Sequence, residues 1–252
     1  MVIKMQNTII DGIISAFILL FTGDPATWQV ILLSLRVSGL AVVFAAMLGI
    51  PIGVIIGMNN FFGKNTVVSL INTLMGLPPV VVGLVVFLAI SRTGPLGSLS
   101  LLYTPTAIMI GQIIIAAPII AGITLAAVSS IDVSVIETAK SLGASRRQTW
   151  SLIIREARVS ILSGVAIGFG QSVSEVGASM MLGGNIEGFT RVMTTDIVLQ
   201  TSQGNYGQAL ALGLTLIILA FIINSVILTR LQFSSKKLAG RKMIALGALS
   251  AR

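Results

Sequence analysis

The sequence contains no cysteine and no histidine in its 252 residues. These absences exclude disulfide bonds, thiol nucleophiles, histidine general bases and the common zinc sites, which draw on these two residue types. Charged residues are also scarce, because they make up 10% of the chain, whereas a soluble domain carries about 25%. Hydrophobic residues make up 55%, and the mean hydropathy is +1.01. This composition predicts an integral membrane protein.

Polar or charged gaps divide the sequence into five long apolar segments, at about 28–57, 66–91, 104–130, 157–183 and 207–231. Several of them reach the roughly 20 residues that a helix needs to cross the hydrocarbon core. A helix satisfies its own backbone N–H and C=O groups, and the runs are continuously apolar rather than alternating. Helices are therefore expected, and a transmembrane barrel is disfavoured. The predicted fold class is an all-α integral membrane protein.

An additional apolar stretch at residues 6–22 has a central run, Ile13 to Phe21, that is too short to span the membrane comfortably. On a helix, six of its side chains share one face: Ile10, Ile13, Ile14, Phe17, Ile18 and Phe21. This pattern favours a helix lying in the membrane interface, with the N-terminus outside. A sixth, short spanning helix, which would place the N-terminus inside, and an uncleaved signal-like segment are the alternatives.

The basic residues predict the orientation. If the gap 131–156 is cytosolic, twelve of the sixteen Lys and Arg residues are also cytosolic: Lys64, Lys140, Arg146, Arg147, Arg155, Arg158, Arg230, Lys236, Lys237, Arg241, Lys242 and Arg252. Loops rich in Lys and Arg stay on the cytoplasmic side, so the C-terminus is predicted to be cytosolic. Three others then lie at or near the outer face: Arg36, Arg92 and Arg191. For Arg36 and Arg191 we expect a headgroup anchor or, as the alternative, a bias of the path toward anions. The net charge of +8 fits anionic lipid better than nucleic acid.

Glycines and prolines within the apolar segments predict how the helices pack. Glycines four residues apart allow close helix approach in lipid, and they occur at Gly49, Gly53, Gly57, Gly164 and Gly168. Prolines inside predicted spans remove a backbone donor and tend to kink a helix, and they occur at Pro51, Pro78, Pro79 and Pro118. The adjacent pair Pro78 and Pro79 frees carbonyl groups that must find partners or line a wet cavity.

Glu175 is the only acidic residue well inside a predicted span, where an unpaired charge is costly. We favour a structural or gating role, in which its carboxylate accepts a hydrogen bond from a neighbouring helix, for example from backbone freed by Pro78 or Pro79. A direct place in the translocation path is the alternative. Three nearby polar side chains could line such a path: Gln171, Ser172 and Ser174.

The charged gap after the third apolar segment has the pattern of a short capped helix. Ser134 precedes Glu137 by three residues, which is the spacing of a capping box. Gly143 fits a left-handed C-terminal cap. Ser145 and Gln148 repeat the capping pattern and predict the start of the next helix. A plain connector between two spans would explain all of these features.

The same gap carries a family motif. Glu137-Thr138-Ala139, followed after three residues by Gly143-Ala144, resembles the cytosolic loop of ABC-importer permeases. Ile153 occupies the place of a further family isoleucine. The sequence departs from the family pattern at Thr138, where a second alanine is usual, and at Arg155-Glu156, where the family often has Leu-Pro.

Further motifs narrow the resemblance to oxyanion permeases of the molybdate, tungstate and sulfate type. Their proline-rich segment resembles Leu77-Pro78-Pro79-Val80-Val81-Val82-Gly83. Their penultimate span resembles Ser174-Glu175-Val176-Gly177-Ala178, with Gly183-Gly184-Asn185-Ile186 following. Two stretches look most like the tungstate branch: Ser91-Arg92-Thr93-Gly94-Pro95-Leu96-Gly97 and Tyr103-Thr104-Pro105-Thr106-Ala107.

The resemblance implies a type I ABC-importer permease with five core transmembrane helices plus an N-terminal amphipathic or short transmembrane helix. Two copies would form the channel, two cytosolic ABC ATPase subunits would bind ATP and Mg²⁺, and an extracytoplasmic binding protein would deliver the oxyanion. A coupling role is implied for Ser134, Glu137, Thr138, Ala139, Gly143 and Ala144. A place in the translocation path or its gate is implied for Pro78, Pro79, Gly83, Ser174, Glu175 and Gly177. The chain itself would hold no cofactor or metal and would have no catalytic residue.

We expect one permease domain over residues 1–252, in a cell membrane that it crosses several times. Its parts are an interfacial helix at 1–24, a transmembrane core at 28–231 that includes the cytosolic coupling loop 131–156, and a basic cytosolic tail at 232–252. ATP hydrolysis must come from a partner, because the nearest approach to a Walker A sequence is one residue too long and ends in Asn65 instead of Ser or Thr.

Two alternatives from other classes stay open. A secondary transporter or channel for a small anion would predict inverted repeats or several buried ionisable residues. An integral membrane enzyme would need a constellation of polar side chains near one interface. Neither pattern is clear in the sequence, and transport that continues without ATP would favour the first.

Overall fold

The computed structural model describes residues 13–14 and 25–226. The predicted interfacial helix lies outside the described residues except for Ile13 and Ile14, and so do the basic tail and the end of the last apolar segment. The described chain is helical and contains no strand. Its elements are α2 (Pro25–Met58), α3 (Lys64–Met75), α4 (Pro79–Ile90), η1 (Gly97–Leu99), α5 (Pro105–Ser129), α6 (Val133–Ser141), α7 (Arg146–Ser174), α8 (Gly177–Gly183) and α9 (Met193–Ser202). A last helix follows at Tyr206–Val226.

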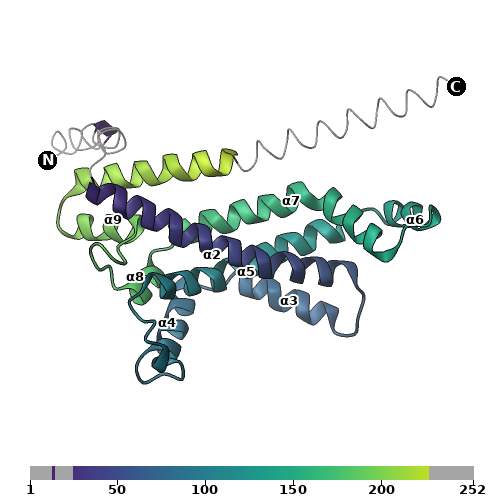
Figure 1. Cartoon of the computed structure of the whole chain (residues 1–252), viewed down its shortest axis with the longest axis horizontal. Helices are drawn as coiled ribbons and strands as arrows, with labels where there is room; N and C mark the ends of the chain where they lie inside the picture. The colour runs from purple at the N-terminus through teal and green to yellow at the C-terminus, as the bar shows by residue number, and fades with distance from the viewer. Residues whose placement is uncertain (1–12, 15–24, 227–252) are drawn as a thin grey trace.

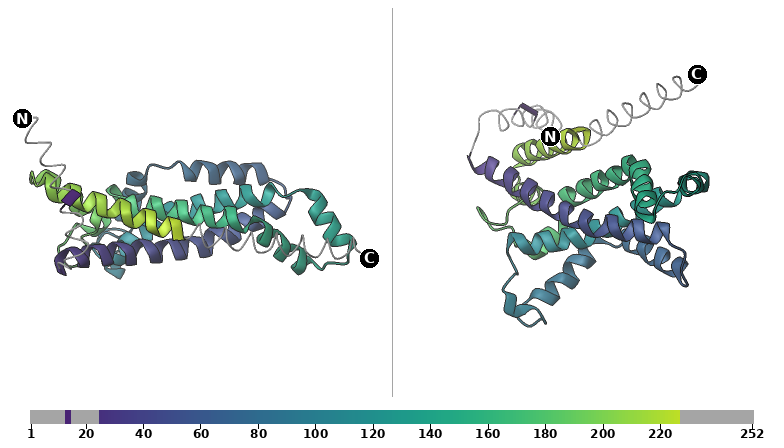
Figure 2. Two further views of the ribbon diagram at one scale, coloured as in Figure 1. Left: turned by 90° about the horizontal axis from the view of Figure 1, so that it is seen from above. Right: turned by 45° about the vertical axis from the view of Figure 1, so that its right-hand side comes forward.

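Three long helices, α2, α5 and α7, run side by side along the molecule and form its core (Figure 1). The last helix packs through Leu216, Ala220 and Ile223 against a core cluster to which α2, α5 and α7 contribute. α6 lies at one end of the molecule, together with the turn between α2 and α3, whereas α8 and α9 lie at the other end. α4 turns away from the bundle, and the two further views show the same arrangement (Figure 2).

The predicted glycine contacts are confirmed. A Cβ placed on Gly49 would lie 2.7 Å from the carbonyl oxygen of Ala117, and one on Gly53 would lie 2.5 Å from that of Ala121. Helices α2 and α5 therefore approach each other along their backbones, which only glycine permits at these positions. On α7, the same construction brings Gly164 to 3.0 Å from the side chain of Ile123, again on α5.

The apolar segment predicted at 66–91 is not one continuous helix, because it breaks at the prolines that were expected to kink it. α3 and α4 form a pair bent by 95° at the short break Gly76–Pro78. Pro78 is the N-cap of α4 and Pro79 its first residue, so neither proline lies inside a helix. Proline suits the first helical position because its missing N–H would have no partner there, and it disfavours helical backbone in the residue before it. Pro51 and Pro118 do lie inside helices, as predicted.

The prediction of one continuous span at 157–183 is wrong at its C-terminal end. α7 begins at Arg146, after the predicted cap Ser145, but it ends at Ser174, before the extended backbone of Glu175. A separate short helix, α8, follows from Gly177. Among the described residues, three helices are long and apolar enough to cross a membrane: Thr27–Met58, Pro105–Ser129 and Tyr206–Val226. The bent pair would make a fourth, whereas α7 carries several charges in its first half.

Candidate functional site

The predicted site residues fall into two groups at different places in the molecule. The coupling residues lie on and after α6, at one end. The path residues lie where α4 meets α8, toward the other end. α7 connects the two groups, because it begins three residues after Gly143 and ends at Ser174. At about 1.5 Å per residue, its 29 residues extend over about 43 Å.

α6 begins at a different cap from the one predicted. Asp132 is the N-cap, and its Oδ1 accepts a hydrogen bond from the N–H of Ser134 at 2.8 Å. The prediction of a capping box between Ser134 and Glu137 is therefore wrong. The backbone N–H of Ser134, and then its hydroxyl, hold the pKa of the Asp132 carboxyl below its usual value. A carboxylate is a stronger acceptor than a hydroxyl at a helix N-terminus, where it also meets the positive end of the helix dipole.

The C-terminal end of α6 has the predicted left-handed glycine. Gly143 has a φ of +79°. Its N–H donates to the carbonyl of Lys140 at 2.9 Å, and the N–H of Ala144 donates to that of Ala139 at 3.0 Å. This pair of bonds is a Schellman motif, which satisfies carbonyl groups that the helix end would leave without partners.

The next helix starts at the predicted capping box. The N–H of Ser145 donates to Oε1 of Gln148 at 2.7 Å, and the N–H of Gln148 donates to the Ser145 hydroxyl at 3.4 Å. α6 and α7 are therefore joined by a turn whose geometry is fixed at each end by hydrogen bonds. Because this turn is held by hydrogen bonds, a displacement of α6 would also displace the start of α7.

α6 presents most of its surface outward. No residue of the helix is buried, and Val133 and Leu142, at its two ends, are 63% and 83% exposed. Of the six predicted coupling residues, Ser134, Glu137, Thr138 and Gly143 are exposed, and Ala139 and Ala144 are half-buried. On the inner side, Ile136 packs against the cluster that contains Val128 and Ile153. The exposed face of α6 is thus available to a partner.

The path residues meet because α4 and α8 approach almost without a gap. A Cβ on Gly83 would lie 2.7 Å from the Cα of Ala178, and one on Gly177 would lie 2.6 Å from Cγ2 of Val80. The proline-rich motif and the motif around Glu175, about 90 residues apart in sequence, therefore form one contact. At its edge, Pro78 and Ser174 are exposed.

Glu175 lies in the break between α7 and α8, with 7% of its surface exposed. Its Oε1 accepts a hydrogen bond from the N–H of Ala178 at 2.9 Å, and its backbone carbonyl accepts one from the Thr194 hydroxyl at 3.0 Å. The predicted acceptor role is therefore confirmed, but the donor belongs to the start of α8 and not to the backbone near Pro78 or Pro79. The carboxylate stabilises the turn that redirects the chain from α7 into α8.

The three predicted lining residues have different surroundings. Gln171 lines a cavity of about 120 Å³ together with Pro79 and Ile115. Ser174 is exposed, and its hydroxyl donates to the carbonyl of Gln171 at 3.2 Å. Ser172 is fully buried, so its placement in a lining is wrong. Its carbonyl accepts a hydrogen bond from Nε2 of Gln112 at 2.9 Å, a contact with α5 that sequence reasoning missed.

Of the two stretches that look most like the tungstate branch, the first follows the end of α4 and the second contacts the end of α8. Tyr103 has a φ of +62°, and its N–H donates to the carbonyl of Leu182 at 2.9 Å. A Cβ on Gly184 would lie 2.8 Å from the ring of Tyr103. Beyond them, Arg191 pairs with Glu187 at 3.2 Å, whereas Arg36 is exposed and lines a cavity of about 280 Å³ between α2 and α5.

Comparison with known proteins gives a consistent picture. Residues 49–235 match the family described as "binding-protein-dependent transport system inner membrane component". The chain is 42% identical over 219 residues to the tungstate uptake system permease protein of Peptoclostridium acidaminophilum, which covers 87% of this chain and 96% of that one. It is 41% identical over 197 residues to a probable anion ABC transporter permease protein of Haloferax volcanii, with 76% and 85% covered.

A solved structure agrees in fold. A bacterial ABC transporter involved in the import of the acidic polysaccharide alginate matches with a TM-score of 0.68 and 23% sequence identity, over 84% of this chain and 81% of that one. At this identity the match bears on the fold alone, and it shows that the present bundle shares the fold of that chain.

Proposed function

Because the chain belongs to the family of binding-protein-dependent transport system inner membrane components, we propose that it is the membrane-spanning permease subunit of an ATP-driven oxyanion importer. A cytosolic ABC ATPase docks on the exposed face of α6 and binds ATP and Mg²⁺. An extracytoplasmic binding protein delivers the substrate. The orientation follows the basic residues, so the end that carries α6 and the C-terminus face the cytosol.

One observation carries this proposal. The exposed helix α6 is joined through a Schellman motif and a capping box to α7, which ends directly at the α4–α8 contact. A push on α6 is therefore passed along a single helix to the turn that Glu175 stabilises. ATP-driven closure of the two ATPases supplies the push and turns the path from inward-facing to outward-facing, and hydrolysis resets it.

The translocation path lies between two copies of the chain. Away from its contact with α8, helix α4 carries exposed large apolar side chains: Val81, Leu84, Val85 and Leu88. A second copy would cover this face and place two α4–α8 contacts beside one central path. Backbone that is not helical at membrane depth is tolerated where it is buried in protein or lines a cavity, and the two breaks near Pro78 and Glu175 fit such a cavity.

Tungstate is the substrate that we propose first, with molybdate or sulfate as alternatives. The support is the name of the bacterial relative at 42% identity and the motifs near Tyr103 and Gly184 that meet beside the path. No Lys or Arg lines the cavity that holds Pro79 and Gln171. An oxyanion would therefore pass without being held tightly, and selectivity would rest mainly with the binding protein.

The first test is to tag the chain, extract it gently from its native membrane and identify what co-purifies. We expect an ABC ATPase at equal stoichiometry and, after reconstitution with the binding protein, tungstate uptake that requires ATP. A chain that comes out alone even after crosslinking in intact cells, or tungstate uptake that continues without ATP, would contradict the proposal. The second result would favour a secondary transporter or channel.

A further inference from the structure

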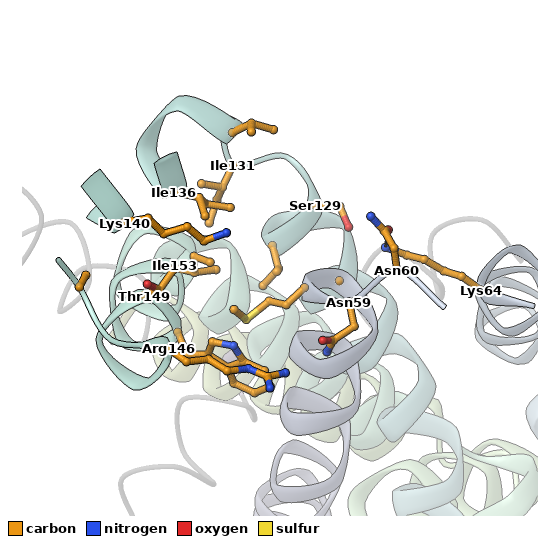
Figure 3. A pocket seen from close by; sticks show the side chains of 16 residues that line it. Asn59, Asn60, Lys64, Ser129, Ile131, Ile136, Lys140, Arg146, Thr149 and Ile153 are labelled. Atoms are coloured by element: carbon orange, nitrogen blue, oxygen red, sulfur yellow. Dashed lines mark hydrogen bonds between the residues drawn. The ribbon is translucent and has the colours of Figure 1, made fainter. Parts of the chain in front are cut away.

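A cavity of about 620 Å³ opens at the end of the molecule that carries α6 (Figure 3). Its walls come from the end of α2, the turn that leads into α3, the end of α5, α6 and the first turns of α7. Three of its lining residues are cationic: Lys64, Lys140 and Arg146. No Asp or Glu lines it. The cavity lies apart from the α4–α8 contact, so the proposed path does not use it.

The three cations come from three different helices. Lys64 is the first residue of α3, Lys140 lies in the last turn of α6, and Arg146 is the first residue of α7. In Figure 3 the Lys140 side chain extends over the cavity from α6, and Arg146 lies below it at the start of α7. Helix starts at Lys64 and Arg146 add the positive ends of two helix dipoles to the charge of the side chains.

These charges are not neutralised within the part of the chain that the structure describes. No carboxylate there is paired with Lys64, Lys140 or Arg146. The ammonium of Lys64 donates to Oδ1 of Asn60 at 3.3 Å, and the guanidinium of Arg146 lies 5.7 Å from the ring centroid of Trp150. Both contacts hold the cation in place but leave its charge intact. Such a concentration of one sign of charge around a concave surface favours an anion.

The other lining residues indicate the kind of anion. Asn59, Asn60 and Ser129 offer uncharged hydrogen-bonding groups beside the cations, whereas the Thr149 hydroxyl already donates to the carbonyl of Ser145. Lys and Arg bind phosphate-type groups readily, Arg through its fixed fork of N–H donors and Lys as a point charge. We propose that the cavity is a binding site for a tetrahedral oxyanion of the phosphate type, held either as the headgroup of an anionic lipid or as a free ion. The cytosolic location of this site rests on the orientation given under the proposed function. The existence of the cavity and the charges that line it are independent of that orientation.

The structure favours the lipid headgroup as the source. Arg146 and Trp150 also line a second cavity of about 520 Å³, together with Arg147, Ser151 and Ile154. Tryptophan beside arginine is typical of the level of the lipid headgroups. Basic pockets between transmembrane helices at the cytosolic side are known to take anionic headgroups. Ile131, Ile136 and Ile153 line the first cavity and offer an apolar surface for the start of an acyl chain.

Binding would have a consequence for coupling. An anion held by both Lys64 and Lys140 links the start of α3 to the end of α6. α3 is the first half of the bent pair that leads to α4, and α6 is the proposed docking helix. Occupancy of the cavity would therefore resist movement of α6 relative to α3, and it would change the rate at which ATP hydrolysis drives uptake.

The test uses the full complex with its ATPase in lipid nanodiscs of defined composition. Phosphatidylglycerol is compared with phosphatidylcholine, and inorganic phosphate is titrated separately into the phosphatidylcholine discs. The readouts are the melting temperature and lipid retained in native mass spectrometry. The variant combines Lys64→Gln, Lys140→Gln and Arg146→Gln. Arg155→Gln is the matched control, because Arg155 is an exposed cation on α7 that lines neither cavity.

We expect phosphatidylglycerol to be retained by the unmodified chain and by the control. The triple variant should bind it about a hundredfold more weakly, because it loses three cations and each Lys or Arg near the surface contributes about fivefold. If the triple variant does not assemble, Lys64→Gln alone should weaken binding about fivefold. Stabilisation by inorganic phosphate in phosphatidylcholine discs, lost in the variant, would instead support the free ion as the source.

Two results would overturn this inference. One is equal binding by the unmodified chain and the cavity variants for both probes. The other is an equal loss in Arg155→Gln, which would mean that only the overall charge of the cytosolic end matters. ATP-dependent uptake by the unmodified complex is measured in the same preparations. Its absence would count against the proposed function, whereas uptake without any cavity-dependent binding would count against this site alone.

Discussion

The α4–α8 contact and helix α6 are held in place by different forces. At the contact, Gly83 and Gly177 leave no room for even one more carbon atom. α6 buries none of its residues and is held mainly by the hydrogen bonds at its ends and by Ile136 on its inner side. A tightly packed contact can change only by moving whole helices, because interiors are not continuously deformable. An exposed, capped helix can be moved as a unit by a partner. This difference suits a mechanism in which the partner moves α6 and the resulting change takes place at the α4–α8 contact.

The largest expected effect is at the packed contact. Gly83→Val places a branched side chain where a single Cβ would already lie 2.7 Å from the Ala178 backbone. Overpacking of this kind lowers the free energy of unfolding by about 1–3 kcal/mol or more, and we expect transport to be lost. Melting of the purified complex and ATP-driven uptake in proteoliposomes measure the two effects. Gly39→Ala is the control, because a Cβ there meets nothing within 4 Å, and it should leave both unchanged.

The second-largest effect is expected at the turn after α6, where a substitution would strain the backbone and would not produce a steric clash. A Cβ on Gly143 meets nothing within 4 Å, so Gly143→Val costs only the left-handed backbone, about 1–2 kcal/mol or somewhat more for a branched residue. The chain should still insert and bind its ATPase, but ATP hydrolysis should no longer drive uptake. Gly143→Asn tolerates this backbone and should keep most of the uptake. Full transport by the valine variant would show that the turn does not couple the two regions.

Substitutions of Glu175 test what holds the α4–α8 region, because the effect of its hydrogen bond can be measured separately from the effect of its charge. Glu175→Gln keeps an oxygen that can accept from the N–H of Ala178, and uptake should stay near normal. Glu175→Ala leaves that buried N–H without its acceptor, which costs about 1–3 kcal/mol of stability. Melting temperature and uptake are compared across the three chains. Equal damage from both substitutions would mean that the charge itself is needed in the path or gate.

The smallest expected effect is at the start of α6. Asp132→Ala removes the side-chain acceptor for the N–H of Ser134, so amide hydrogen exchange in the first turn of α6 should become a few-fold faster. Ser134→Ala keeps that acceptor and should change the exchange much less. Hydrogen exchange followed by mass spectrometry distinguishes the two variants. The reverse order would restore Ser134 as the cap.

The same cap predicts a pH dependence. The pKa of Asp132 is lower in the folded protein, so its contribution to stability is fully present above the unfolded value of about 3.9. The contribution is lost as the pH falls through the folded pKa, when the carboxylate is protonated. The protection factor of the amides in the first turn of α6, which corrects for the slower intrinsic exchange in acid, should therefore fall as the pH is lowered in the unmodified chain, and this step should be absent in Asp132→Ala.

Local signals in the sequence predicted the ends of helices better than the direction of the chain. The left-handed backbone at Gly143 and the capping box at Ser145 and Gln148 were predicted, because each depends on residues a few positions apart. The N-cap of α6 was misplaced because Asp132 and Ser134 are both good caps, and only geometry decides between them. The close approach at Gly49 and Gly53 was also predicted, since small residues at this spacing have one common use in membranes.

The sequence predicted a kink at the first break but not the second break, and both breaks lie in segments that are apolar over most of their length. Hydropathy measures only how strongly residues avoid water. A straight spanning helix, a bent helix pair and two helices separated by a break can therefore have the same hydropathy profile. Gly76 and Pro78 carried a usable signal, since the residue before a proline avoids helical backbone. The second break has no proline, and one of the two hydrogen bonds that Glu175 accepts there comes from Thr194, nineteen residues away. Contacts of this kind depend on the tertiary fold and leave no trace in local sequence.

The central claim is that α6 is the docking point of an ATPase, and the absence of cysteine makes it directly testable. A single cysteine is introduced as Leu142→Cys, at the 83% exposed end of α6, or as Leu99→Cys, in η1 toward the other end and 57% exposed. Each chain is expressed with its ATPase and treated in intact membranes with a short thiol-to-amine crosslinker. The account predicts a crosslink to the ATPase from Leu142→Cys and none from Leu99→Cys. Equal crosslinking from both positions, or none from Leu142→Cys in membranes that transport tungstate with ATP, would contradict it.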